Sequence, residues 1–351
     1  IKVGAYGLIR VGEMAGWGLE LGSAAPWLGP GVTILGTCTM ILGVVAALLQ
    51  GDAKRLLAYH SISQMGYIIL GLGVGLYLGP QGSLGLVGAI YHIVNHALFK
   101  AALFLGVGVI YVGTKETNLY NLGGLWRSFP VTAILMFLAV LGITGAPGLN
   151  GYASKTILHH AVSQAALTGS PLMIWAERLF LVVGVGTAAS FTKLYYLIFL
   201  GKPGRAKVSK GETWQFQIAM GLLAVAMVGI GLRPGLFSEA WAVPAAEALG
   251  MGNAEVVLAD LAFWNSADIM GMVITLGLGM AFCWAGFKTG LFHWHPPIYL
   301  TLEGLGGMAY KGLTSVSEAG GRLYSSLVAG ILRHVRTRGS RLLEAGQKLD
   351  N

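Results

Sequence analysis

The 351-residue sequence has few charged residues: Asp, Glu, Lys and Arg make up 11% of it, against ~25% in typical soluble domains. So few charges exclude a water-soluble globular protein of this size. Hydrophobic residues make up 55% of the chain, and the mean hydropathy is +0.68. Several apolar runs reach the ~20 residues that a helix needs to cross a bilayer. The composition therefore predicts a membrane protein.

Cysteine is nearly absent, and the common cofactor motifs are missing. Cys38 and Cys283 stand singly in apolar runs, without CxxC, zinc or iron–sulfur spacing. There is no GxGxxG between a strand and a helix, no P-loop and no nucleophile triad. We therefore expect no cofactor and no redox chemistry in this chain. The net charge of +8 does not indicate nucleic acid, because the basic residues lie mostly in short loops and the C-terminal tail.

The beginning of the chain also lacks familiar signals. It opens at Ile1 without Met, a charged n-region or a cleavage site, and enters an apolar segment at once. We therefore expect the C-terminal part of a longer or processed protein.

The apolar runs predict an all-α fold, a polytopic transmembrane bundle. Helices are expected at about 1–12, 31–50, 55–78, 82–112, 130–166, 174–199, 214–233 and 267–288. The run 82–112 is long enough to be one helix or two. The run 130–166 is expected to break near 145–155, because glycines and Pro147 interrupt it. Broken helices in membranes mark ion or substrate sites.

The last part of the chain has a different pattern. Apolar residues recur at helical spacing within 302–346, among basic residues, which predicts an amphipathic helix for a membrane surface or a partner protein. Its markers are Leu323, Tyr324, Leu327, Val328, Ile331 and Val335, with Arg322, Arg333, Arg336, Arg338 and Arg341. We therefore divide the chain into three parts: a first group of spans over 1–200, further spans over 201–290, and an amphipathic, basic tail over 291–351.

Charge in the loops predicts an orientation. The loop 201–213 carries four Lys or Arg residues, whereas 234–266 carries Glu239, Glu247, Glu255 and Asp260 without Lys or Arg. The positive-inside rule places the first loop in the cytoplasm and the second outside. Each span moves the chain to the other side of the membrane. Counting the spans from these two loops places the following on the cytoplasmic side as well: Lys54, Arg55, Lys115, Arg127 and the C-terminal tail.

The segment YHIVNHALFK (91–100) puts His92, His96 and Lys100 on one face of a helix, because they are spaced four residues apart. A charge at the bilayer centre costs ~2.5–3.5 kcal/mol on insertion scales, so each such group needs a reason. Imidazoles titrate near neutral pH, and a row of them linked by water can relay protons. A structural role inside the bundle and a metal or haem site on the two histidines are the alternatives.

Other ionisable groups stand in or beside apolar runs. Lys155 lies about one turn into the second half of the broken helix, in GITGAPGLNGYASKTIL, and a re-entrant or loop lysine in water is its alternative. Lys54 opens a helix in GDAKRLLAYHSISQMGY, which continues with a polar stripe too dense for a lipid-facing surface. Lys2 is either functional or a snorkelling lysine near a helix end. The remaining candidates are His60, His159, His160 and Lys193.

Five segments occur in an order that resembles a known family. They are KVGAYGLIR, GDAKRLLAYHSISQMGY, HIVNHALFKAALFLGVGVIY, NLGGLWRSFP and GITGAPGLNGYASKTIL. They resemble the antiporter-like subunits of respiratory complex I, membrane-bound hydrogenases, formate hydrogenlyases and multisubunit Na⁺/H⁺ antiporters. The resemblance covers about residues 1–200, and the rest is similar only as hydrophobic spans and a tail.

The resemblance implies a fold of two inverted repeats, each with a broken helix, and a set of relay residues. Lys2 and Lys155 fall on the broken-helix lysines of the first and second repeats. His92, His96 and Lys100 fall on the connecting polar axis, and Lys54 on the DxKR entry of a helix. The glutamate that pairs with the first-repeat lysine would lie upstream of Lys2, so this piece alone is not expected to translocate ions.

The resemblance implies a proton- or H⁺/Na⁺-translocating membrane subunit of a redox-driven complex, such as an NADH:quinone oxidoreductase or a membrane-bound hydrogenase. A subunit of a multisubunit Na⁺/H⁺ antiporter is the alternative, and a structural membrane anchor is an alternative of another class. Expected partners are other membrane subunits, lipid and, indirectly, peripheral redox subunits. The expected location is the cell (inner) membrane.

Overall fold

The computed structural model describes residues 2–14, 26–250, 253–259, 261–294, 304, 306–308, 310–318, 320–321 and 325. The chain divides into two compact units, 1–294 and 295–351. Regular structure in the described part is helical, apart from one isolated bridge between Asp52 and Asn118. The all-α prediction is confirmed.

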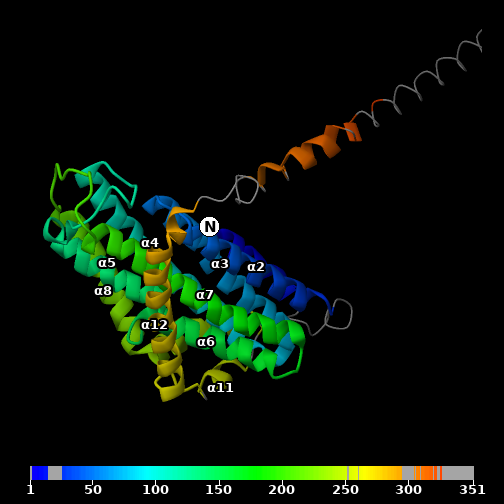
Figure 1. Cartoon of the computed structure of the whole chain (residues 1–351). Coiled ribbons are helices and arrows are strands. Elements are labelled where there is room, and N and C mark those ends of the chain that lie inside the picture. Colours follow the sequence, from blue (N-terminus) through cyan, green and yellow to red (C-terminus); the bar gives the residue numbers. More distant parts are fainter. Residues whose placement is uncertain are drawn as a thin grey trace, which may run out of the picture. The chain divides into compact units, whose positions relative to one another are not determined.

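The long helices of the first unit agree with the predicted spans to within a few residues (Figure 1). They are α1 (Lys2–Met14), α2 (Leu28–Leu48), α3 (Ala53–Leu78), α4 (Ser83–Thr114), α5 (Pro130–Thr144), α6 (Asn150–Ala166), α7 (Pro171–Tyr195), α8 (Trp214–Leu232) and α12 (Ser266–Thr289). Short helices α9 (Pro234–Phe237), α10 (Val243–Ala248) and α11 (Ala254–Ala259) follow α8. Among the described helices, α2, α3, α4, α7, α8 and α12 are long and apolar enough to cross a membrane. The run 82–112 is one unbroken helix, α4.

Local sequence explains where key helices begin and end. Asp52 caps α3 by accepting a hydrogen bond from Arg55 N at 2.9 Å, as an N-cap carboxylate does. The helix α5 ends at Thr144, and the next residue is Gly145, whose φ of +89° favours glycine. The predicted break therefore lies between Thr144 and Asn150.

Glycine allows two pairs of helices to pack very closely. A Cβ on Gly66 of α3 would lie 2.4 Å from Met40 N of α2. A Cβ on Gly151 of α6 would lie 1.8 Å from Gly142 O of α5. Such close backbone contact is the role of small residues in membrane helices.

The apolar core consists of two main clusters with polar side chains between them along the helices. One cluster includes Tyr67, Leu86, Ile157 and Phe180, and the other includes Leu56, Phe99, Met136, Phe191 and Phe199. On α3, α4 and α7, most of the buried polar positions lie at the junction between residues of the first cluster and residues of the second. A buried polar layer thus divides the bundle interior.

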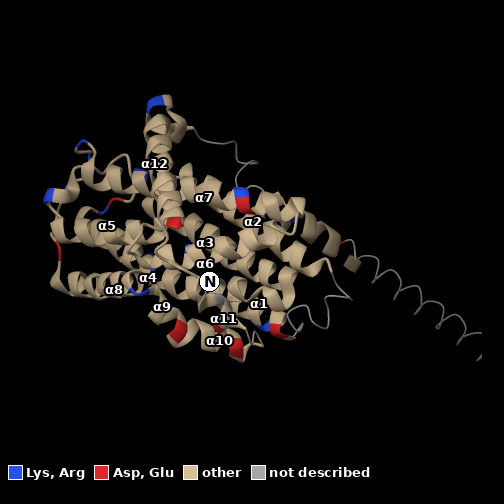
Figure 2. Cartoon of the chain, turned by 90° about the horizontal axis from the view of Figure 1, so that it is seen from below, with Lys and Arg blue, Asp and Glu red and all other residues tan. Residues whose placement is uncertain are grey.

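The two ends of the bundle differ in charge (Figure 2). Backbone hydrogen bonds join the loops at one end: Ala53 N to Thr117 O at 2.9 Å, and Ala206 N to Asn121 O at 2.9 Å. These loops carry the basic residues of 49–55, 115–129 and 201–213. Glu239, Glu247 and Glu255 lie in or beside α9, α10 and α11 at the other end. The basic and acidic loops therefore lie at opposite ends, as the spans predict.

In the second unit, the described residues between 304 and 325 are helical. Met308, Tyr310, Leu313 and Val316 are exposed there. All the apolar and arginine markers of the predicted amphipathic helix, from Arg322 to Arg341, lie outside the described residues. The amphipathic character of 302–346 stays a prediction.

Candidate functional site

The broken helix holds the Lys155 side chain at the centre of the candidate site. Lys155 is 2% exposed, and its Nζ donates to Ile143 O at 2.9 Å and Thr144 O at 3.2 Å. These carbonyls belong to the last turn of α5, where backbone acceptors have no partner within the helix. The break thus supplies the acceptors that a buried ammonium needs.

His92 lies beside this lysine and links three helices. Its Nε2 donates to Gln64 Oε1 of α3 at 3.1 Å, and its Nδ1 lies 2.8 Å from Ser154 Oγ of α6. Because a carbonyl oxygen only accepts, Nε2 carries the hydrogen, and Nδ1 of the neutral ring accepts from the serine. A proton added at Nδ1 would turn that bond around, and Ser154 Oγ could then donate to Gly151 O, 3.4 Å away. The site can therefore hold His92 with or without the extra proton.

Two asparagines fix the beginning of α6 against α4. Asn95 Nδ2 donates to Asn150 O at 2.7 Å, and Asn150 Nδ2 donates back to Asn95 Oδ1 at 3.2 Å. Both side chains are fully buried. This reciprocal pair sets the position of Ser154 and Lys155, which lie about one turn further along α6.

The row continues along α4 toward the basic end. The rings of His92 and His96 are nearly parallel, with centroids 6.4 Å apart, which is too far for a direct hydrogen bond. Lys100 is 5% exposed, and its Nζ donates to Leu57 O of α3 at 2.6 Å. All three side chains of the predicted stripe therefore lie on the buried face of α4.

A second group of polar residues extends the row to the basic end. His60 Nε2 hydrogen-bonds to Ser190 Oγ of α7, and the serine itself donates to Gly186 O at 2.9 Å. Phe191 connects His60 with Lys100, since its ring lies 4.5 Å from the His60 ring and 5.7 Å from Lys100 Nζ. Lys193 is completely buried.

Lys193 ends this group at the C-terminus of α2. Its Nζ donates to Leu48 O at 2.6 Å and to Gln50 O at 2.8 Å. A lysine at the carbonyl end of a helix is electrostatically favourable.

The charges in this row are of one sign. No Asp or Glu is buried in the described part of the chain, whereas Lys100, Lys155 and Lys193 all are. Each lysine is bound by backbone carbonyls instead of a carboxylate. Gain or loss of a proton by one group therefore changes the electrostatic energy of its neighbours, because screening is weak in the interior.

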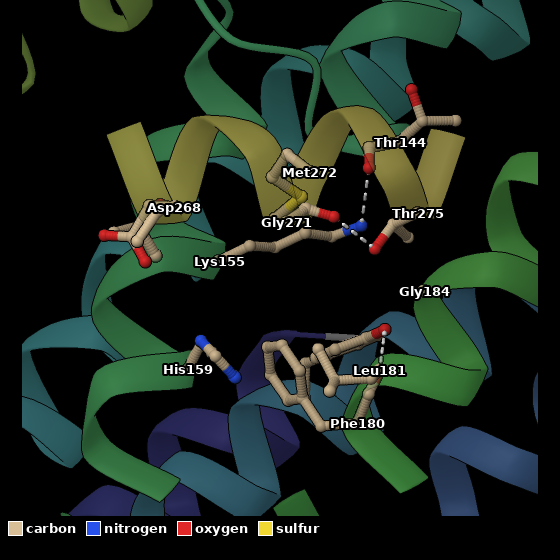
Figure 3. A pocket seen from close by; sticks show the side chains of 13 residues that line it. Thr144, Lys155, His159, Phe180, Leu181, Gly184, Asp268, Gly271, Met272 and Thr275 are labelled. Carbon is tan, nitrogen blue, oxygen red and sulfur yellow. Dashed lines mark hydrogen bonds between the residues drawn. The ribbon is translucent and has the colours of Figure 1, made fainter. Parts of the chain in front are cut away.

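A cavity of about 80 Å³ opens beside Lys155 (Figure 3). In Figure 3, Lys155 and His159 of α6 point into it, and Asp268, Met272 and Thr275 come from α12. Phe180 and Leu181 of α7 line the opposite wall. The cavity gives Lys155 a route toward the acidic end of the bundle.

The structure brings four of the six expected relay residues together: His92, His96, Lys100 and Lys155. Lys54 lies apart from them, exposed at the basic end, with its Nζ 3.9 Å from the centre of the Tyr111 ring. Lys2 is the first residue of α1, and its side chain lies outside the described residues. In the described part of the chain, no group of three His, Cys, Asp or Glu residues could hold a metal ion.

Several residues of the site were not predicted as relay groups. Gln64, Asn95, Asn150 and Ser154 are uncharged, and only Asn95 and Ser154 stand directly beside a predicted relay residue. His60 and Lys193 were noticed as ionisable residues only. The signal that could have identified them is the polar spacing on α7, where Thr187, Ser190 and Lys193 recur every third residue.

Known proteins resemble this chain in sequence and in fold. Residues 1–179 match the family described as NADH:quinone oxidoreductase/Mrp antiporter, transmembrane. The chain is 31% identical to formate hydrogenlyase subunit 3 of Escherichia coli over 244 residues, which are 66% of this chain and 38% of that protein. The chain spans about a third of the length of the curated relatives it matches.

Two solved structures resemble the fold. A chain in the Mrp complex from Dietzia sp. superposes with a TM-score of 0.69 and 26% identity, covering 91% of this chain and 33% of that one. A chain in respiratory complex I from Thermus thermophilus gives a TM-score of 0.55 at 26% identity, covering 70% of this chain and 50% of that one.

Proposed function

Because the chain belongs to the NADH:quinone oxidoreductase/Mrp antiporter membrane family, we propose that it moves protons, or exchanges H⁺ for Na⁺, as a membrane subunit of a redox-driven ion-pumping complex. The chain is a multi-pass membrane protein. The observation that carries the proposal is the buried row from Lys155 through His92 and His96 to Lys100. A structural core has little use for two buried lysines without a carboxylate partner and two parallel imidazoles, because each is costly to bury.

The row supplies the chemistry of a proton wire. Lys100 and Lys155 each hold a proton on Nζ, and the imidazoles of His92 and His96 accept and give protons between them. Like charges on the two lysines repel, so a proton arriving at one favours release from the other. The distances between the rings require water or side-chain rotation for each transfer.

The driving reaction belongs to partner subunits in this proposal, since the sequence carries no cofactor motif. The named relatives include a formate hydrogenlyase subunit, and the similar structures are multisubunit complexes. We therefore propose other membrane subunits as direct partners, with lipid around the bundle and peripheral redox subunits acting indirectly. The location we propose is the cell (inner) membrane. The orientation we propose places the basic loops and the C-terminal tail in the cytoplasm.

An antiporter subunit is the second candidate, and it is supported by the similarity to the Mrp complex. The two candidates share the row of buried groups and differ in what drives it. Vesicles that move protons with electron transfer but not on addition of Na⁺ would favour the first candidate. The reverse result would favour the second.

Lys100→Ala in the intact protein tests the proposal. We expect proton movement to fall at least tenfold in inverted membrane vesicles, followed with a pH-sensitive dye, while the amount of assembled protein is unchanged. Lys207→Ala is the control, because Lys207 is exposed in the basic loop. Normal proton movement in the Lys100→Ala vesicles would favour a membrane anchor instead.

A further inference from the structure

The cavity at Lys155 leads to a second group of ionisable residues near the acidic end. Lys155 and His159 lie one turn apart on α6 and both line the cavity (Figure 3). Beyond them, Glu177 lies in the second turn of α7, and Asp268 lies in the first turn of α12. Three helices therefore contribute ionisable side chains at the point where the Lys155 cavity approaches the surface.

The group consists of two carboxylate–imidazole pairs. His160 Nε2 lies 2.8 Å from Asp268 Oδ2, and His159 Nε2 lies 4.0 Å from Glu177 Oε1. The His159 and His160 rings meet edge to face, with centroids 6.3 Å apart, so the pairs adjoin. We call these four residues the mouth cluster.

Exposure separates the mouth cluster from the buried row. The side chains of His159 and Glu177 are 30% and 29% exposed, and those of His160 and Asp268 are 38% and 14% exposed. Lys155 is only 2% exposed. His159 and Asp268 line the cavity, so a proton leaving Lys155 by this route meets two groups that touch both the cavity and the surface.

The contacts keep His159 ready to transfer a proton. Its Nε2 is buried and has no hydrogen-bond partner among the described residues, and 4.0 Å to Glu177 is beyond direct hydrogen-bonding range. Glu177 Oε1 accepts a hydrogen bond from Ser163 Oγ instead. Asp268 is held by Asn265, whose Nδ2 donates to it at 2.5 Å. Both carboxylates are therefore held by hydrogen bonds, whereas Nε2 of His159, which lies between them and Lys155, is not.

We infer that the mouth cluster is the release end of the ion pathway, where protons pass from Lys155 through His159 to Glu177 and the His160–Asp268 pair. This inference rests on the proposed function. In each step Lys155 Nζ gives up one proton to the His159 imidazole, which passes it to a carboxylate oxygen or to water at the surface. No electrons move, and Lys155 is left neutral until the row reloads it.

The test uses neutral, nearly isosteric replacements of the carboxylates. We expect the double variant Glu177→Gln, Asp268→Asn in the intact protein to lower proton movement in inverted vesicles at least fivefold in Na⁺-free medium. Glu255→Gln is the matched control, because this exposed carboxylate lies at the same end on α11, outside the cavity. It should move protons at the unmodified rate.

Lys155→Ala, measured in the same vesicles, separates the two claims. If proton movement is lost in Lys155→Ala but normal in the double variant, the mouth cluster is not the release end, and the proposed function still stands. Normal rates in both overturn the proposed function. A defect of the double variant that appears only with Na⁺ present overturns a proton role for the cluster. If the double variant is missing from the membrane, His159→Gln, which keeps both carboxylates, decides by the same criteria.

Discussion

Lys155 of α6 binds the end of α5: its Nζ lies 2.9 Å from Ile143 O and 3.2 Å from Thr144 O, across the break between the two helices. The break and the lysine therefore depend on each other. The helix end has unpaired carbonyls that need donors, and the buried ammonium needs acceptors. A change in the protonation of Lys155 acts directly on the joint between α5 and α6.

Gly151→Ala should disturb this joint. The added Cβ would lie 1.8 Å from Gly142 O, so α5 and α6 must separate, at a cost of about 1–3 kcal/mol for overpacking. We expect a lower thermal unfolding temperature for the detergent-purified intact protein. Gly221→Ala on α8 is the control, since a Cβ there meets nothing within 4 Å. Equal unfolding temperatures for the two variants would contradict this close contact.

Gln64→Ala should slow proton movement by misplacing His92. The variant removes the Gln64 Oε1 acceptor that holds His92 Nε2 at 3.1 Å, and one hydrogen bond contributes ~0.5–1.5 kcal/mol. We expect a decrease of about threefold to tenfold in the vesicle assay. Ser63→Ala is the control. Ser63 lies on the same helix as Gln64, and its replacement also removes a buried hydrogen bond, the one to Met40 O of α2. A decrease as large in the control would indicate general loosening of α3.

Asp52→Ala should destabilise the beginning of α3. Asp52 accepts hydrogen bonds from Arg55 N at 2.9 Å and from Thr117 Oγ1 at 2.5 Å, so it joins the helix to the 115–129 loop. Loss of an N-cap costs about 0.5–2 kcal/mol. We expect chemical denaturation of the purified Asp52→Ala protein to show this decrease in the free energy of unfolding. Asp52→Asn should largely retain the stability of the unmodified protein. Equal losses in both would show that charge, not capping, matters.

Glu116 should make stability depend on pH at the basic end. The backbone N–H of Asn118 lowers the pKa of this carboxyl most, with help from the side chain of Asn121 and the backbone of Thr117. A lowered folded-state pKa gives stability that is present above the ordinary value of about 4.3. That stability is lost as the pH falls through the folded-state pKa.

Unfolding of the purified protein between pH 7 and pH 3 checks this expectation. Glu116→Gln should be less stable than the unmodified protein at pH 7, and the difference should shrink as the pH falls. A difference that stays constant over this range would contradict a role for the ionised carboxylate.

The sequence was sufficient to predict the spans and the break because they depend on local patterns. Apolar runs define the helices, and Gly145 with Pro147 interrupts one of them. The stripe His92, His96 and Lys100 also follows from helical spacing alone. The structure places all three on the buried face of α4.

Contacts between distant segments could not be predicted in this way. His60 meets Ser190, 130 positions later, and Lys193 binds carbonyls of residues 48 and 50. Nothing in the spacing of one helix specifies which helix faces it. Lys54 illustrates the same limit: its position beside a polar stripe favoured a place in the row, but it lies in the first turn of α3 and is exposed. Its relay role stays a prediction.

Lys155→Ala tests the central claim most directly, because this lysine joins the broken helix, the histidine row and the cavity. The measurement is the initial rate of proton movement in inverted vesicles containing the intact protein, normalised to assembled protein, with Lys207→Ala alongside. The account predicts a loss of at least tenfold in Lys155→Ala and the unmodified rate in Lys207→Ala. An unmodified rate in both, with normal assembly, would contradict it.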